Sequence, residues 1–221
     1  MPFDASLLVP TLQRTRSLVE RIPHAALICW LGVTVLGAAA DVAARAMGGN
    51  AAVIWLMHGF GLTFAEIWIT REALRAEGCR PVLTFAGIFT LYLLSLIVGL
   101  GIFFGLLLFI LPGLYFAARW YLAGAILVQE GGGTGAAIWR SWDLLQRHWL
   151  TAFVLGLFLG GAALSPLLVD ANEMPGTGQA FALLLGFNVI SAGGIVGGYI
   201  ASVALYLNIE RPASTLQEIF G

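Results

Sequence analysis

Four ionisable side chains stand in otherwise apolar stretches of the sequence, and they are the groups best placed to do chemistry. They are His58, Glu66, Arg119 and Glu130. A charge inside a membrane costs free energy, so such groups usually bind a proton, an ion or a ligand, or pair with one another. We take these four residues as a candidate intramembrane polar or ligand site.

The residue types in this sequence do not predict a catalytic site. His24, His58 and His148 lie far apart, with no HExxH motif or carboxylate–histidine cluster that would hold a metal. All eleven basic residues are arginine, which excludes a Walker-type phosphate loop and a Schiff-base lysine. Gly131-Gly132-Gly133, without that lysine, predicts a flexible linker. We expect no catalytic, cofactor-binding or metal site, and a protein that is not an enzyme.

The composition is typical of an integral membrane protein. Hydrophobic residues make up 59% of the 221 residues and charged residues only 10%, against roughly 45–50% and 25% in soluble domains. A soluble protein of this size could not hide so much apolar surface in one core. The net charge of −1 comes with no dense basic patch, so we expect no nucleic-acid partner.

Six apolar stretches predict membrane spans, since about 20 helical residues cross ~30 Å of hydrocarbon. No charge lies between Arg80 and Arg119, and one helix of that length would reach ~57 Å, so this stretch should hold two spans. We place a turn near Gly99-Leu100-Gly101 and expect Pro112-Gly113 to kink the following span. The predicted spans are about 25–46, 51–69, 82–99, 103–128, 150–169 and 180–208.

Two amphipathic stretches, about 6–22 and 135–148, predict helices at the membrane surface. Pro23 should end the first helix or bend it into the first span. Its apolar stripe is Leu8, Leu12, Thr15, Val19 and Ile22. In the second helix the stripe includes two tryptophan anchors and comprises Ile138, Trp142, Leu145 and Trp149.

The arginines indicate the orientation. With the N-terminus inside, most of them fall on the cytoplasmic side, including those of a polar loop expected at 70–81. The loop from Asp170 to Gln179 has no basic residue, as an outer loop should. The predicted fold class is therefore all-α: a polytopic transmembrane bundle of six spans with interfacial helices. It forms one membrane domain, residues 1–221, with both termini cytoplasmic.

Glycines recur at four-residue spacing in the last two predicted spans. The pairs are Gly156 with Gly160, Gly193 with Gly197, and Gly194 with Gly198. Such faces let helix backbones approach closely in lipid. We expect them to pack within this bundle, and homodimerisation is the alternative.

Arg119 is the most informative of the four candidates because it falls close to mid-membrane. Glu66 could pair with it if the second and fourth spans are neighbours, and Glu130 is the alternative partner, reached by snorkelling. One interpretation makes Arg119 an internal strut held by carbonyls freed at Pro112. The other makes it the site for an anionic head group or a solute carboxylate. Asp41 and Arg45, four residues apart, should pair with each other.

Four short motifs follow one another between Ile110 and Trp149. They are Ile110-Leu111-Pro112-Gly113, Arg119-Trp120, Glu130-Gly131 and Arg140-Ser141-Trp142. This stretch resembles the membrane domain attached to some bacterial glycerophosphodiester phosphodiesterases, and it resembles YciC-like inner-membrane proteins. The resemblance implies a bacterial inner-membrane location and a helical bundle. It implies no activity, because catalysis in those enzymes belongs to a separate soluble barrel with histidine and carboxylate metal ligands, which we do not expect here.

The function expected from the sequence is that of a non-enzymatic inner-membrane protein that binds lipid or a membrane-protein partner, as a scaffold or assembly factor. Membrane lipids are the expected partners, with another membrane protein or a second copy of the chain as alternatives. The alternative function is a transporter or permease for a small solute or a lipid, which would use the kinked fourth span. No cofactor is expected.

Overall fold

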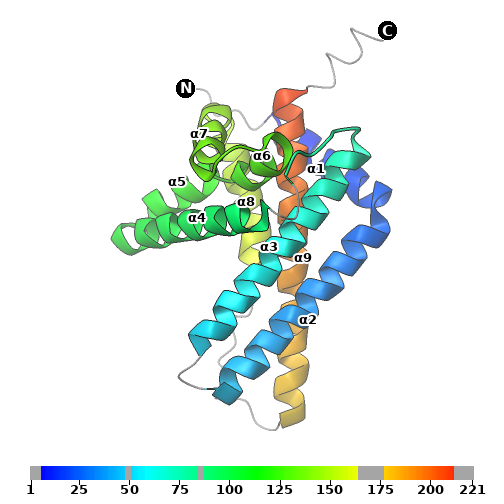
Figure 1. Cartoon of the computed structure of the whole chain (residues 1–221), viewed down its shortest axis with the longest axis vertical. Coiled ribbons are helices and arrows are strands. Elements are labelled where there is room, and N and C mark those ends of the chain that lie inside the picture. The colour runs from blue at the N-terminus through cyan, green and yellow to red at the C-terminus, as the bar shows by residue number, and fades with distance from the viewer. Residues whose placement is uncertain (1–5, 48–50, 84–86, 164–176, 212–221) are drawn as a thin grey trace.

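The computed structural model describes residues 6–47, 51–83, 87–163 and 177–211, and these residues form helices and connecting turns without a strand (Figure 1). The expected all-α fold class is confirmed. Five helical segments in this part of the chain are long and apolar enough to cross a membrane, as in a membrane protein. They are Pro23–Ala46, Val53–Ala76, Ile88–Leu108, Ile110–Glu130 and Phe181–Glu210.

The helix bounds place most of the expected elements within a few residues. The helices are α1 (Leu8–Arg21), α2 (Pro23–Met47), α3 (Ala51–Ala76), α4 (Ile88–Leu108), α5 (Ile110–Arg119), α6 (Ala123–Glu130), α7 (Thr134–Leu144), α8 (Trp149–Ala163) and α9 (Thr177–Glu210). The expected fifth span, 150–169, corresponds to α8, which has 15 residues. Its remainder and most of the loop from Asp170 to Gln179 lie outside the described residues. Six spans are therefore an approximate count.

The first helix packs on the bundle through a face that shares Leu8 and Ile22 with the expected stripe. Pro23 begins α2, a position that proline tolerates because the first helical N–H needs no partner within the helix. Thr11 and Leu18 are the buried residues of α1, whereas Leu12 and Val19 are exposed. The buried face is thus rotated from the expected stripe, because α1 contacts α9 and α3 on one side and leaves part of its apolar surface uncovered.

The polar loop expected at 70–81 is largely helix, because α3 continues to Ala76. Arg75 and Glu72 form an ion pair of 2.7 Å one turn apart, which supports the helix beyond its apolar part. The helix ends at Gly78, whose φ of 74° is left-handed, with the N–H of Cys79 donating to the carbonyl of Leu74. Charged residues here mark the end of the apolar segment rather than the end of the helix.

The turn expected at Gly99-Leu100-Gly101 is wrong, because α4 runs through these residues to Leu108. Phe109, with φ −159° and ψ 136°, is the extended residue that separates α4 from α5. Pro112 falls in the first turn of α5, so it helps to start this helix and does not kink it. The predicted boundaries of the third and fourth spans, 82–99 and 103–128, change accordingly.

Glycines hold α4 and α5 together as a hairpin. A side chain at Gly101 would collide with the ring of Trp120, and one at Gly105 would lie 2.7 Å from the Cα of Gly113. A side chain at Gly113 would in turn collide with the backbone of Leu106. These glycines are contact points between antiparallel helices. In Figure 1 this hairpin projects sideways from the long axis of α9.

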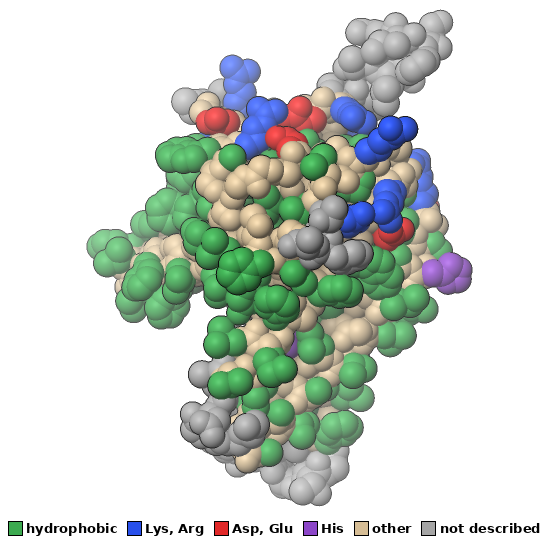
Figure 2. All heavy atoms as spheres, in the orientation of Figure 1, with side chains coloured by type: hydrophobic (Ala, Val, Ile, Leu, Met, Phe, Trp, Pro, Cys, Tyr) green, Lys and Arg blue, Asp and Glu red, His purple; other side chains and the backbone are tan. Residues whose placement is uncertain are grey.

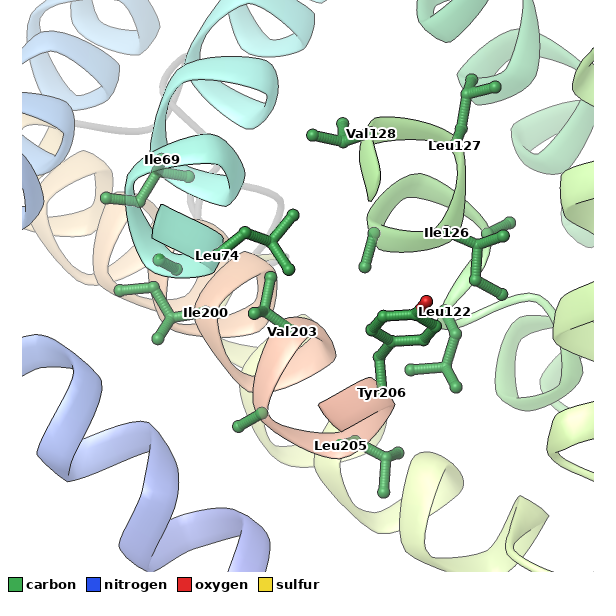
Figure 3. Close-up of a cluster of buried hydrophobic side chains, with 14 of the residues drawn as sticks. Ile69, Leu74, Leu122, Ile126, Leu127, Val128, Ile200, Val203, Leu205 and Tyr206 are labelled. Carbon is green, nitrogen blue, oxygen red and sulfur yellow. The ribbon is translucent and has the colours of Figure 1, made fainter. Parts of the chain in front are cut away.

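The fourth apolar stretch is broken a second time, between α5 and α6. Trp120 to Leu122 form a turn between the two helices. The largest buried side chains gather around α6 and the adjoining ends of α3 and α9 (Figure 3). This core therefore fixes α6 against α3 and α9, whereas the α4–α5 hairpin extends away from it.

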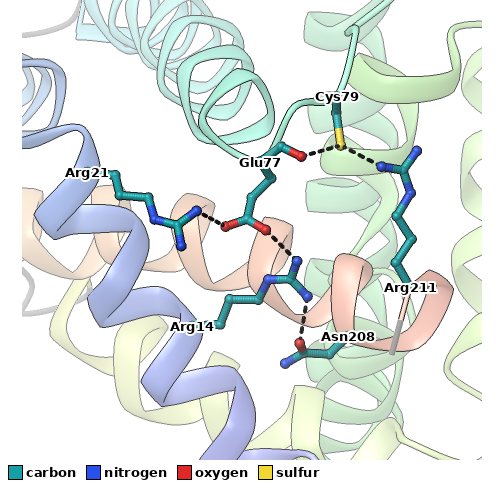
Figure 4. Close-up of polar contacts among 6 residues, drawn as sticks. All are labelled: Arg14, Arg21, Glu77, Cys79, Asn208 and Arg211. Atoms are coloured by element: carbon teal, nitrogen blue, oxygen red, sulfur yellow. Dashed lines mark hydrogen bonds and ion pairs between the residues drawn. The ribbon is translucent and has the colours of Figure 1, made fainter. Parts of the chain in front are cut away.

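Charged side chains gather at the end of the molecule where α1, α6 and α7 lie, and apolar side chains cover the flanks below them (Figure 2). At this end Glu77 accepts hydrogen bonds from Arg14 at 2.5 Å and from Arg21 at 3.0 Å (Figure 4). Arg14 also donates to Asn208 near the end of α9 at 2.9 Å. This network joins α1 to α3 and α9, so the beginning of α1 and the end of α9 lie on the same side.

Candidate functional site: an apolar cavity with a buried carboxyl group

A cavity of about 560 Å³ lies among α3, α4, α5, α6, α8 and α9. Its walls are almost wholly apolar, and it is only partly enclosed. The volume lies within the range of about 300–1,000 Å³ that small-molecule sites occupy. The polar side chains on its walls are Glu66, Ser95, Tyr121, Tyr199 and Ser202.

Two of the glycine pairs expected to pack helices line this cavity instead. Gly156 and Gly160 of α8 and Gly194 and Gly198 of α9 all lie on its wall. A side chain at Gly160 would meet nothing within 4 Å, and one at Gly156 would meet the ring of Tyr121 at an ordinary 3.8 Å. The missing side chains therefore leave space on the side of α8 and α9 that faces the cavity, while the two helices stay in close contact with each other. The third pair keeps helix contacts, since a Cβ at Gly197 would lie 3.4 Å from Leu159.

A second cavity, of about 590 Å³, adjoins the first between α3, α4 and α9. The two cavities share Glu66, Ser95 and Tyr199. These three polar residues come from three different helices and form the wall between the two spaces. A molecule in either cavity would touch the same polar group.

Glu66 occupies its place because α6 carries a glycine beside it. A Cβ on Gly124 would collide with the carboxyl oxygen of Glu66. Within the described part of the chain, no ion pair or hydrogen bond joins this carboxyl to another side chain. A polar group removed from water without a partner is costly, and in a membrane protein it usually marks a site.

Arg119 does not pair with Glu66, so that expectation is wrong. Its side chain is 4% exposed, and its guanidinium carbon lies 4.3 Å from the ring centroid of Trp142 and 5.8 Å from that of Tyr115. The reason is the turn after α5, which directs Arg119 toward α7, while Gly124 in the next helix faces Glu66. Carbonyls freed at Pro112 do not hold it either, since this proline starts α5.

Ser141 stabilises the break between α5 and α6. Its hydroxyl donates to the carbonyl of Arg119 at 2.8 Å and accepts from the N–H of Leu122 at 3.3 Å. The backbone groups freed by the break are thus satisfied without water. Trp142 covers the Arg119 guanidinium, so Ser141 and Trp142 from one motif both support the Arg119-Trp120 motif.

The tryptophans expected as membrane anchors belong to this aromatic cluster. The ring centroid of Tyr115 lies 5.7 Å from Trp142 and 5.8 Å from Trp149. Trp139 is the tryptophan of α7 that is exposed, at 69%. The two aromatic faces beside Arg119 belong to Trp142 and Tyr115, while Trp149 packs on Tyr115. The role of these tryptophans as membrane anchors stays a prediction.

Glu130 lies at the charged end and outside both cavities. It accepts a hydrogen bond from the Tyr206 hydroxyl at 2.9 Å, and Arg140 lies 3.9 Å away. Arg140 also donates to Glu210 at 2.5 Å. Glu130 therefore joins α6 to α7 and α9 and is not a partner of Arg119.

His58 lies eight residues before Glu66 on α3, ~12 Å away along the helix axis. Its Nδ1 is buried without a hydrogen-bond partner, and its ring meets Trp55 edge-on at 5.7 Å. Nearby, Asn188 donates to Asp41 at 2.8 Å, so Asp41 pairs with α9 rather than with Arg45. The four candidates thus lie in four separate surroundings, and Glu66 is the one among them that lines the two cavities described above.

Comparison with protein-family models, curated proteins and solved structures finds no match to this chain. The cavity residues that the sequence does not single out include Ser95, Tyr121 and Tyr199. Hydroxyl groups on apolar helices were their only signal, and this signal does not show which helix face turns inward.

Proposed function

We propose that this chain is a non-enzymatic membrane protein that binds the apolar chain of a lipid or another amphiphile. The observation that carries the proposal is the apolar cavity of about 560 Å³ lined by six helices and only partly enclosed. Glycines on facing sides of α8 and α9 leave its space unfilled, and long apolar helices surround it. A cavity with such walls suits hydrocarbon and offers few groups to a polar solute.

The proposed location is a bacterial inner membrane with both termini in the cytoplasm. The motifs between Ile110 and Trp149 support the location through their resemblance to inner-membrane domains. The arginine-rich end of the molecule supports the orientation, since basic residues favour the cytoplasmic side. A role as scaffold or assembly factor, with bound lipid or a second membrane protein, fits this placement.

Filling the cavity tests the proposal. Gly156→Leu places a leucine side chain in the cavity, and Gly186→Leu on α9 is the matched control, because Gly186 is exposed and its Cβ would meet nothing within 4 Å. We expect the wild type and Gly186→Leu to retain lipid during purification, measured by native mass spectrometry, and Gly156→Leu to lose it. Equal retention by all three proteins would refute binding in this cavity. Gly160→Leu repeats the test should Gly156→Leu fail to fold.

Transport of a small solute or a lipid is the second candidate function. Two adjoining cavities that meet at Glu66, next to the broken α5–α6 segment, favour it, because transporters place sites beside discontinuous helices. A single-cysteine variant distinguishes transport from lipid binding: it carries Ser95→Cys and lacks Cys29 and Cys79. A transporter should be labelled by an impermeant thiol reagent from both membrane sides, whereas a binding protein that opens toward lipid should resist it from both.

A further inference from the structure

We infer that Glu66 selects the head group of the bound molecule, and that this head group is a protonated amine on an alkyl chain. The inference rests on the proposed binding function. Glu66, Ser95 and Tyr199 line both cavities, so the polar end of a bound chain meets them whichever space the hydrocarbon fills.

The protein supplies no positive partner for Glu66 among the described residues. Arg71, five residues further along α3, donates to the carbonyl of Leu83, and Arg119 lies against Trp142. A carboxylate in low dielectric is stabilised strongly by a cation and destabilised by a second anion. A cationic ligand is therefore favoured over a fatty acid of the same length.

The three polar side chains match the hydrogen bonds of an ammonium group. A primary ammonium has three N–H donors and no acceptor. Glu66, Ser95 and Tyr199 line both cavities, and their carboxyl and two hydroxyl groups can each accept a hydrogen bond. Beyond them the walls are apolar, which suits the alkyl chain that carries the amine.

Three ligands share one alkyl chain and differ in the head group, so their affinities separate the contribution of the head group to binding from that of the hydrocarbon. Dodecylamine, dodecanol and dodecanoate are titrated against the full-length protein in detergent, with binding measured by calorimetry. The variant is Glu66→Gln, which keeps the shape and removes the charge. Glu72→Gln is the matched control, since Glu72 lies on the same helix and pairs with Arg75 at the surface.

We expect the wild type and Glu72→Gln to bind dodecylamine most tightly and dodecanoate most weakly. Glu66→Gln should weaken dodecylamine binding roughly 10- to 100-fold, the value of one charged hydrogen bond in a desolvated site, and leave dodecanol unchanged. Gly156→Leu should weaken the binding of all three ligands, because it removes space and not charge.

The possible results distinguish failure of the head-group inference from failure of the proposed lipid-binding function. If none of the three ligands binds the wild type, the proposed function fails. If all three bind equally, or if Glu66→Gln keeps the preference for the amine, the head-group inference fails while the cavity remains a binding site. Competition by nanodiscs of phosphatidylethanolamine identifies an amine-headed lipid as the source, and its absence identifies a free amine. Equal competition by phosphatidylglycerol nanodiscs would overturn the requirement for an amine.

Discussion

A double-mutant cycle on Arg119 and Trp142 tests how this protein holds a buried charge without a carboxylate. The guanidinium carbon lies 4.3 Å from the indole centroid, and Arg119 is 4% exposed. Cation–π contacts are worth roughly 0.5–1 kcal/mol at exposed sites and about 2 kcal/mol when desolvated. We therefore expect Arg119→Met and Trp142→Leu to couple by about 2 kcal/mol, a factor of ~30 in the unfolding equilibrium.

The assay is reversible unfolding in mixed detergent micelles, followed by circular dichroism so that loss of a tryptophan does not alter the signal. Trp139→Leu is the control on the same helix, because Trp139 is 69% exposed and should not couple to Arg119. We also expect Glu66→Arg not to rescue Arg119→Glu. A coupling near zero with Trp142, together with rescue by Glu66→Arg, would show that Arg119 pairs with Glu66 and would refute the geometry given above.

Two further predictions concern contacts that sequence analysis did not foresee. Glu77→Ala should release α1 from α3 and α9 and cost roughly 1.5–3 kcal/mol, the value of hydrogen bonds to a charged group, measured as faster proteolysis within α1; Glu20→Ala, which removes only an exposed pair, should not change the rate. Gly124→Ala should displace the Glu66 carboxyl, because the new Cβ would overlap its terminal oxygen, and should change the melting temperature little, because this flexible side chain can move. A large loss of thermal stability in Gly124→Ala, not reversed by Glu66→Ala in the same chain, would mean that Gly124 is needed for another reason.

Hydropathy and charge were enough to locate most helices, but they were not enough at the α4–α5 hairpin. The sequence offered glycines near residue 100 as the turn, and the structure turns at Phe109, one extended residue among apolar neighbours. Nothing in its type distinguishes this phenylalanine from the residues around it. The glycines are instead required where two helices touch, which is a property of the helix pair and not of the local sequence.

The candidate site was predicted in part. Glu66 lies on a long apolar helix, as its sequence context indicated, and the cavity that it lines was not foreseen. The pairing with Arg119 failed because partner assignment depends on the rotation of each helix. Three residues of turn between α5 and α6 change that rotation, and Ser141, which stabilises the turn, lies on a different helix.

Glycines have two opposite structural roles in this chain. At Gly105 and Gly113 the missing side chains bring helices into contact, whereas at Gly156 and Gly160 they leave a space open. The cavity of about 560 Å³ is only partly enclosed and its walls are almost wholly apolar, so in a membrane we expect hydrocarbon to fill it. The glycines of α8 and α9 on its walls determine how much hydrocarbon it can hold.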